Sequence, residues 1–535
     1  MRSKTGDHLR LMVAVFVAFL ALYAWTAAPG ILYGDSGEMQ TAALVGGVPH
    51  ATGYPAFLLF GRLFSKIPWP DPAFRITFMS SFFGAASLVL LIGVLFELGV
   101  APLAACAGVA IYGLSFTFWR VSLRAEVYTV GIFLALLGIW RTLAAIRAGS
   151  LWSYLVAAFL LGATLTGHLT FLLPVAAMGI ALAWFGVRKF KRPIVVLALL
   201  AGAFALGLTP YLYLVWLDLH NHTMNYYDLV MLAKNPRGLP VPDFDTPWKH
   251  LVWMLTGRNM YPPVPFHFDV RSTCISLMHS VAILWLFEFG PVTLPFALWG
   301  WTRLMRQARA AAVLLTILFL VSVAFSAALQ GGAMLHIFLI PALIVTAVFI
   351  AVGIDAAFEH WGASHHTPVA ATWVAGAALV ALVVIPDQWI RIYTAAHPIG
   401  RWGFHVEEEG TTARPTLFPS MSAYRDPERF AKQAIAAIPQ NALVAAEWSE
   451  FNALRYSQLV LGERPDLTLQ TATSETRPLR IELWQKANDI TRRPVVFIPW
   501  NPGLGPRAAP LDSVPLGPDQ WMYVLTHPLE LAGSP

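Results

Sequence analysis

Long apolar runs separated by short polar stretches make up most of the first 386 residues. A helix that crosses a lipid bilayer needs about 20 apolar residues, and about eleven stretches meet or approach this length. They cover residues 9–28, 74–97, 101–119, 126–146, 152–168, 169–187, 193–216, 277–301, 311–329, 336–357 and 369–386. The pattern therefore predicts an all-α polytopic membrane domain over residues 1–386, with about 11 transmembrane helices.

Two details of this pattern concern its start and one of its turns. No small-residue cleavage site follows the first run, so we expect a retained helix rather than a cleaved signal peptide. The fifth and sixth runs are continuous except at Gly167-His168, which we interpret as a tight turn between two helices.

Lysine and arginine residues gather in alternate short loops. They precede the first run and follow the fourth, sixth and eighth runs, as Arg2, Lys4, Arg147, Arg188 and Arg303 illustrate. Cytoplasmic loops carry the excess of these residues, so the N-terminus is expected in the cytoplasm. The long loops 29–73 and 217–276 and the tail then lie outside the cytoplasm. Because the cytoplasmic loops are short, we expect the chemistry on the outer face.

The tail, residues 387–535, is more polar and alternates helical with strand-like segments. Helices are expected over 427–438, 450–461 and 480–490, and strands over 442–446, 467–471, 494–498 and 522–525. This alternation predicts a small, soluble, parallel α/β domain outside the cytoplasm. It contains no GxGxxG or GKS/T loop, so no nucleotide is assigned to it.

Composition supports the membrane assignment and excludes other classes. The chain is 57% hydrophobic and 12% charged, whereas soluble domains carry about 25% charged residues. Its net charge of +6 is dispersed between apolar runs, so no nucleic-acid partner is expected. Cys106 and Cys274 lie in or beside apolar runs, which argues against a disulfide framework and a cysteine metal site.

The first outer loop carries Asp35 and Glu38 directly after the first run. At a spacing of i, i+3 the two carboxylates share one helical face at the membrane surface, as a catalytic pair would. The alternative is structural: Asp35 or Ser36 caps a short helix, with Glu38 in its first turn. The apolar stretch 56–67 is too short to span, and a helix lying in the interface fits it better.

The segment Asp35-Ser36-Gly37-Glu38, followed by 47–55 with His50 and Tyr54, resembles the N-terminal signature of the transmembrane-protein-260-like family of GT-C glycosyltransferases. Similar short motifs follow in the family's order, at 125–129, 167–170, 210–214, 253–258, 338–341, 441–443 and 461–466. The chain departs from the family at Ala51-Thr52, where two prolines are usual. It also departs at 221–225, in place of an Asn-Pro-Pro-rich segment.

The resemblance implies a GT-C-like fold and a bacterial inner-membrane enzyme. Such an enzyme moves a sugar from a polyprenyl-phosphate carrier to an acceptor hydroxyl on the non-cytoplasmic face, with inversion. The acidic residue of the first outer loop, here Asp35, would act as the base, and Glu38 is the second catalytic candidate. The eukaryotic member is a protein O-mannosyltransferase, so mannose is one candidate sugar, and a protein or an envelope glycan the acceptor.

Candidate donor-binding residues lie at the expected outer membrane boundaries. Arg124, His168 and Arg258 could contact the carrier phosphate, since arginine forks match phosphate oxygens. The alternative for each is an interfacial cation that reaches toward lipid headgroups.

Three further side chains could assist at the donor. Glu126 is a candidate ion-pair partner of Arg124 or a support for the first loop. His50 and Tyr54 could hydrogen-bond to sugar or phosphate, or simply brace the loop. No HExxH or comparable spacing occurs, so no obligatory metal or other cofactor is expected, although the resemblance leaves a divalent metal open.

Two other functions compete with sugar transfer. A polytopic transporter of a lipid-linked or small polar substrate should show related halves and polar residues near the mid-bilayer, whereas this chain gathers its acids and bases at one face. A membrane-anchored binding protein would use the tail as its working part, but about eleven spans far exceed what an anchor needs.

Overall fold

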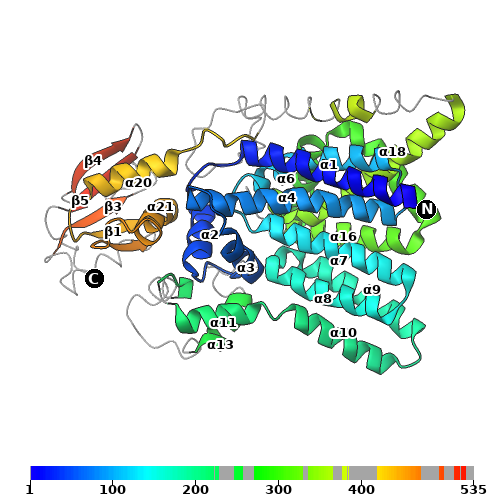
Figure 1. Ribbon diagram of the computed structural model, residues 1–535, viewed down its shortest axis with the longest axis horizontal. Coiled ribbons are helices and arrows are strands. Elements are labelled where there is room, and N and C mark those ends of the chain that lie inside the picture. The colour runs from blue at the N-terminus through cyan, green and yellow to red at the C-terminus, as the bar shows by residue number, and fades with distance from the viewer. Residues whose placement is uncertain are drawn as a thin grey trace.

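The protein is described here from a computed structural model. It describes residues 2–221, 223–227, 246–256, 270–328, 335–365, 376–381, 384, 419–471, 493–498, 511–517 and 520–525. A bundle of long helices forms one part of the molecule, and a small sheet with its helices lies at one end of that bundle (Figure 1).

Within the described residues, seven helices are long and apolar enough to cross a membrane. Their segments are α1 (Arg2–Thr26), α4 (Pro72–Glu97), α7 (Tyr128–Ala148), η1 with α9 (Leu169–Phe171 and Leu172–Lys189), α10 with α11 (Pro193–Gly207 and Tyr211–His220), α16 (Arg309–Ala328) and α18 (Ile340–His365). The pair α5 (Pro102–Gly113) and α6 (Phe116–Ser122) bends by 72° and would make an eighth span if it crosses as one unit. The protein is thus an integral membrane protein.

Seven of the eleven expected spans match these helices, and four do not: 101–119, 152–168, 277–301 and 369–386. The span expected over 152–168 is α8 (Leu151–Gly167), a shorter apolar helix of 17 residues. The turn at Gly167-His168 is confirmed, because α8 ends there and η1 begins at Leu169. The expected span 101–119 is the bent pair α5 and α6. Most of 369–386 lies outside the described residues.

The expected span 277–301 is not one helix and needs correction. α14 (Val270–Ala282) passes into the π-helix η2 (Ile283–Glu288), and the helical path stops at Gly290 before η3 (Pro291–Thr293) and α15 (Leu294–Gln307). Gly290 has a φ of 70°, and Pro291 has no N–H to continue a helical ladder. Apolar residues continue on both sides of this break, so the sequence pattern does not reveal it.

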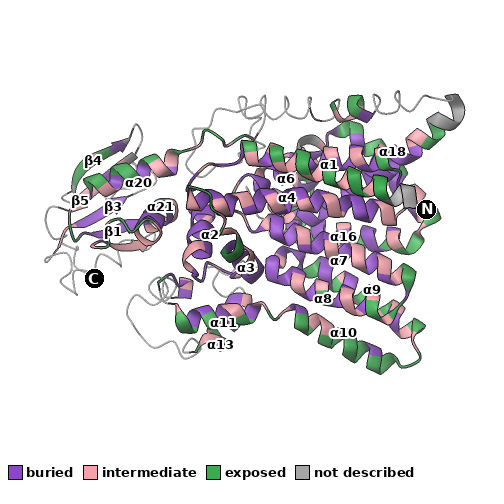
Figure 2. Ribbon diagram, viewed as in Figure 1, coloured by how far each residue is buried: buried purple, intermediate pink, exposed green. Residues whose placement is uncertain are grey.

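Helix backbones approach each other closely at glycine residues, because glycine has no side chain. A Cβ on Gly300 of α15 would lie 1.9 Å from the Phe349 carbonyl oxygen of α18, and one on Gly162 of α8 would lie 2.1 Å from that of Phe204 in α10. Small residues at such crossings are typical of membrane bundles. Helices differ in how far they are buried in the bundle. α4 and α7 are mostly buried, whereas α10 exposes apolar side chains, as a lipid-facing helix does (Figure 2).

The tail forms a mixed five-stranded sheet with order β2-β1-β3-β5-β4. Its described elements are α20 (Asp426–Ala437), β1 (Leu443–Ala446), α21 (Trp448–Leu459), β2 (Thr468–Thr471), β3 (Val495–Ile498), β4 (Leu511–Gly517) and β5 (Gln520–Leu525). β1 runs parallel to β2 and β3, as expected, but β5 is antiparallel to β3 and β4. The expected all-parallel sheet is therefore wrong. The helix expected over 480–490 and the expected domain boundary after 386 lie outside the described residues.

Three short helices cover the end of the bundle that faces this sheet domain. They are α2 (Gly34–Val45), α3 (Pro55–Phe64) and α13 (Pro247–Leu255). The helix expected over 56–67 is confirmed as α3. α2 packs directly against α21 of the tail domain (Figure 1).

Candidate active site

The capping interpretation of the first loop is wrong. Helix α2 begins at Gly34, and its N-cap is Tyr33, which makes no side-chain capping hydrogen bond. Asp35 therefore lies inside the first turn, where a carboxylate is favoured by the helix dipole but is not needed as a cap. Asp35 and Glu38 do share one face of α2, as their spacing predicts, and His50 lies against both of them.

Glu38 binds His50 through both of its carboxylate oxygens. Its side chain is only 1% exposed, Oε1 accepts the His50 backbone N–H at 2.8 Å, and Oε2 contacts His50 Nδ1. Both oxygens of the buried carboxylate thus bind one residue of the following loop. This pairing joins α2 to the segment that leads into α3.

His50 donates from both ring nitrogens. The Tyr54 hydroxyl gives its single hydrogen to the Ala51 carbonyl at 2.7 Å, so its oxygen accepts from His50 Nε2 at 3.1 Å. Burial lowers the pKa of His50, but the charges of Asp35 and Glu38 outweigh it and raise this pKa to about 10. The ring is therefore an imidazolium at neutral pH, and Glu38 balances its charge.

Asp35 is the accessible carboxylate of the cluster. Its side chain is 42% exposed. Oδ1 accepts a 2.7 Å hydrogen bond from Trp448 Nε1, and Oδ2 lies 3.7 Å from His50 Nε2. Because Glu38 and His50 neutralise each other, Asp35 carries the net negative charge of the cluster.

The same three residues have the spacing of a metal site. One ligand atom from each of Asp35, Glu38 and His50 lies within 4.8 Å of the others. Carboxylate and imidazole groups are common ligands of divalent ions. However, His50 offers a lone pair only without its second proton. A divalent ion could bind His50 only by displacing one of its two ring protons, of which Glu38 accepts one and Tyr54 the other.

Arg124 and Glu126 form a second charged pair beside the first loop. Glu126 Oε1 accepts a 2.6 Å hydrogen bond from the Ser36 hydroxyl and lies 3.8 Å from Arg124 Nε. Burial raises the pKa of Glu126, against the opposing charge of Arg124. Arg124 Nε is buried and makes no hydrogen bond within the described part of the chain. Both contacts expected of Glu126 are present: it pairs with Arg124 and supports the first loop through Ser36.

His168 completes the group from the turn between α8 and η1. Its ring stacks on Tyr54, with centroids 5.4 Å apart, and tilts against Tyr128 at 4.9 Å. Its Nδ1 accepts the Thr170 backbone N–H at 3.0 Å, so the ring proton lies on Nε2. The structure thus gathers every expected site residue except Arg258, which lies outside the described residues.

Gln40 was not anticipated from the sequence. This fully buried amide accepts the Leu32 N–H at 2.9 Å and donates to the Gly30 carbonyl at 3.1 Å and to the Thr77 hydroxyl at 3.0 Å. It therefore ties the segment before α2 to α4. Its position one turn beyond Ser36 is the only local signal, and that signal does not distinguish it from any polar residue on the helix.

Tyr226 and Trp448 were also missed, and both come from distant parts of the chain. Tyr226 donates its backbone N–H to the Val48 carbonyl at 2.9 Å. Its ring packs edge-on against His50 and Trp448, each with centroids 6.2 Å away. Two aromatic rings from distant parts of the chain thus border His50.

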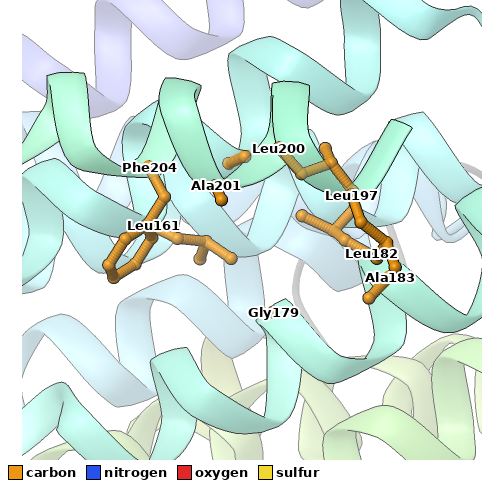
Figure 3. A pocket seen from close by; sticks show the side chains of 9 residues that line it. Leu161, Gly179, Leu182, Ala183, Leu197, Leu200, Ala201 and Phe204 are labelled. Atoms are coloured by element: carbon orange, nitrogen blue, oxygen red, sulfur yellow. The ribbon is translucent and has the colours of Figure 1, made fainter. Parts of the chain in front are cut away.

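An apolar groove runs between α8, α9 and α10. Two adjoining hollows of 290 and 410 Å³ share Gly179, Ala183 and Phe204 in their walls, and Figure 3 shows aliphatic side chains and Phe204 around the first. The larger hollow is lined by Leu165 and Leu172, which lie within one turn on either side of His168. We call these joined hollows the apolar groove; its walls come from α8, α9 and α10.

Comparison with known proteins identifies the segment that holds this site. Residues 35–191 match the family model described as the protein O-mannosyl-transferase TMEM260 N-terminal domain. The resemblance expected from the motifs is thus confirmed over this segment. The match begins at Asp35 and includes all the described candidates, namely Asp35, Glu38, His50, Tyr54, Arg124, Glu126 and His168.

Two individual proteins are also similar. The chain is 31% identical over 215 residues to the mouse (Mus musculus) protein O-mannosyl-transferase TMEM260, and the match covers 38% of this chain and 30% of the mouse protein. The chain thus spans less than a third of this relative. A solved structure of ArnT from Cupriavidus metallidurans, bound to undecaprenyl phosphate, aligns over 96% of this chain and 97% of its own, with a TM-score of 0.48 and 12% identity.

Proposed function

From the N-terminal domain that residues 35–191 share with the TMEM260 family, we propose that the protein is a membrane glycosyltransferase. It moves a sugar from a polyprenyl-phosphate carrier to an acceptor hydroxyl. One observation carries the proposal: the segment matched by the family model contains the cluster of carboxylates, imidazoles and an arginine. This cluster lies at one end of a helical bundle. The mouse relative's name makes mannose the first sugar to test and a protein hydroxyl the first acceptor, with an envelope glycan the second.

Asp35 acts as the general base. It is the exposed carboxylate of the cluster, whereas both oxygens of Glu38 already bind His50. Asp35 takes the proton of the acceptor hydroxyl while the acceptor oxygen bonds to the anomeric carbon. The bond from that carbon to the phosphate oxygen breaks, and polyprenyl phosphate leaves. A single displacement of this kind inverts the anomeric centre.

The leaving group explains why one carboxylate suffices. A phosphate ester is a weak base, so it departs without a proton from a general acid. Charge develops on the sugar ring and on the phosphate, and fixed charges near them lower the barrier. The role of Glu38 is then to hold His50 and to cancel its charge, so that Asp35 faces the acceptor as the net negative group.

Arg124 and the apolar groove form the donor side. Arg124 Nε is buried without a hydrogen bond among the described residues and lies near a carboxylate only at 3.8 Å. A phosphate oxygen would satisfy this donor and add a charge-assisted bond. The groove has apolar walls that include Leu165 and Leu172, which flank His168 in the sequence, and this suits a polyprenyl chain whose phosphate lies near that turn. Arg258, from the second outer loop, remains a candidate for the same phosphate.

The site is assigned to the non-cytoplasmic face because of the charge at the other end of the bundle. Arg147 near the C-terminus of α7 pairs with Glu97 at the end of α4, and Lys189 ends α9 close to Gly149. These basic helix ends lie opposite to α2 and α3 (Figure 1). Positive charge marks the cytoplasmic side, so the cluster and the tail domain lie outside.

Transfer from a defined donor tests the proposal. The purified protein in liposomes is given labelled polyprenyl-phosphate mannose and serine- or threonine-containing acceptor peptides, with heat-inactivated protein as the control. In parallel, the gene is deleted, and envelope glycoproteins and glycolipids are compared by mass. We expect labelled peptide or the loss of a hexose-bearing species on deletion, restored by the wild-type gene. Neither transfer nor any change in the envelope would contradict the proposal.

A further inference from the structure

Trp448 of the tail domain donates its indole N–H to Oδ1 of Asp35 across 413 positions of the sequence, at 2.7 Å. We propose that the tail domain is a working part of the active site, and that Trp448 is a positioning residue that orients the Asp35 carboxylate. This inference rests on the proposed function. It assigns a role to residues outside the segment 35–191 that is shared with the TMEM260 family.

Several contacts seat the tail domain on the outer end of the bundle. A Cβ on Gly37 of α2 would lie 3.6 Å from the Cβ of Asn452 in α21. The Tyr33 ring packs on Phe430 of α20 with centroids 6.0 Å apart. The Met421 N–H donates to the carbonyl of Thr26, the last residue of α1, at 2.8 Å. The position of Trp448 is therefore fixed by an interface and does not depend on one hydrogen bond.

The indole itself is held on several sides. Its ring stacks on Phe451, at 6.1 Å, and meets His50 and Tyr226 edge-on at 6.4 and 6.2 Å. A rigid donor of this kind restricts the rotation of the carboxylate that it binds. With Oδ1 held, Oδ2 is the oxygen left to receive the acceptor proton.

An indole suits this role chemically. Tryptophan Nε1–H is a donor only and carries no charge. Trp448 therefore can neither take the acceptor proton in place of Asp35 nor neutralise the carboxylate, as a lysine or arginine would. Alignment of a base with its proton is worth a large factor in rate, and a displacement of about 1 Å can cost about 100-fold.

A purely structural role for Trp448 predicts a different result from a positioning role. Trp448→Phe keeps a large ring for packing and removes only the N–H. If Trp448 merely fastens the domain, this variant loses stability and keeps its turnover number. If it positions Asp35, kcat falls while the KM for the donor stays near the wild-type value, because the donor side of the site is unchanged.

The test measures kcat and donor KM for Trp448→Phe in the full-length protein. Trp521→Phe in β5 is the matched control, because it makes the same chemical change in the same domain, in a strand that lies beside the edge strand β4 of the sheet. We expect kcat to fall about 10- to 100-fold in Trp448→Phe, with donor KM within about twofold, and no change in Trp521→Phe. A wild-type kcat in Trp448→Phe, or an equal loss in both variants, would overturn the inference.

A second measurement does not need activity. The thermal unfolding midpoints of Asp35→Ala, Trp448→Phe and the double variant form a cycle that reports whether the two side chains interact. We expect the combined shift in Tm to be smaller than the sum of the single shifts. Additive shifts would overturn the inference even if the enzyme is active. Wild-type protein that transfers no sugar would overturn the proposed function, whereas the cycle would still show whether Trp448 holds Asp35.

Discussion

The hydroxyl of Ser36 donates a 2.6 Å hydrogen bond to Oε1 of Glu126, the same oxygen that lies 3.8 Å from Arg124 Nε. One carboxylate thus joins the first outer loop to the segment that leads into α7. Ser36, which follows Asp35, and Arg124, the residue proposed to bind the donor phosphate, thus contact the same carboxylate. The proposed acceptor and donor sides of the site share this support.

Loss of this bond should destabilise the fold. Ser36→Ala leaves the half-buried carboxylate of Glu126 without its hydroxyl donor, and hydrogen bonds to charged groups contribute about 1.5–3 kcal/mol. We expect the free energy of unfolding in detergent to fall by about that amount. Ser153→Ala is the control, because its hydroxyl bonds to Ser150 in an exposed position. Equal stability of Ser36→Ala and Ser153→Ala would show that the Ser36–Glu126 bond contributes nothing.

Stability should depend on pH through His50. The pKa of His50 is raised from 6.5 to about 10 by the facing carboxylates, so the folded state keeps a proton that the unfolded chain releases above about pH 6.5. The stabilisation is complete below that pH and is lost as pH rises toward 10. We expect Tm to fall over this interval, and to fall less steeply in His50→Gln. The exposed His220→Gln should retain the wild-type slope, and an unchanged slope in His50→Gln would refute the ion pair.

Arg124 should matter for the donor. Arg124→Ala is expected to lower kcat/KM for the polyprenyl-phosphate donor about 10- to 100-fold, the scale of a lost charge-assisted hydrogen bond. Arg124→Lys should restore only part of this, because a point charge cannot form the bidentate fork. Arg147→Ala serves as the control, since Arg147 lies about 28 Å along α7 from Tyr128. Wild-type donor kinetics in Arg124→Ala would remove Arg124 from the site.

The orientation of the chain can be measured directly. A phosphatase reporter fused after residue 390 should be active, because this point follows the last expected span and lies outside the cytoplasm. The same reporter fused after Gly149, between α7 and α8, should be inactive. The reverse pattern would place the Asp35 cluster in the cytoplasm and would exclude a donor presented on the outer face.

Much of this arrangement could be predicted from local sequence. Apolar runs mark most of the spanning helices because a span must satisfy its backbone internally and cover it with apolar side chains. The i, i+3 spacing brings Asp35 and Glu38 to one face of α2. The break at Gly290-Pro291 could not be predicted from the apolar pattern. The residues around it remain apolar, although the backbone leaves the helix there.

The start of α2, strand β4 and the contact of Trp448 could not be predicted from the local sequence. The capping hypothesis failed because the N-cap of α2 is Tyr33, two residues before Asp35 and three before Ser36, so that the helix begins at Gly34. Strand β4 was missed because its sequence, with Pro515 inside, does not read as a strand; it lies at the sheet edge, where proline is tolerated. Trp448 was missed because its partner is 413 positions away.

Turnover by Asp35→Asn tests the central claim most directly. The substitution keeps the size of the side chain and an oxygen for Trp448, but removes the charge and the proton acceptor. Glu38→Gln is the comparison, because it disturbs His50 and leaves Asp35 intact. We predict that Asp35→Asn folds, binds donor normally and turns over about 10²- to 10⁴-fold more slowly, the usual contribution of a positioned base, with a smaller loss in Glu38→Gln. Wild-type turnover by Asp35→Asn would contradict the account.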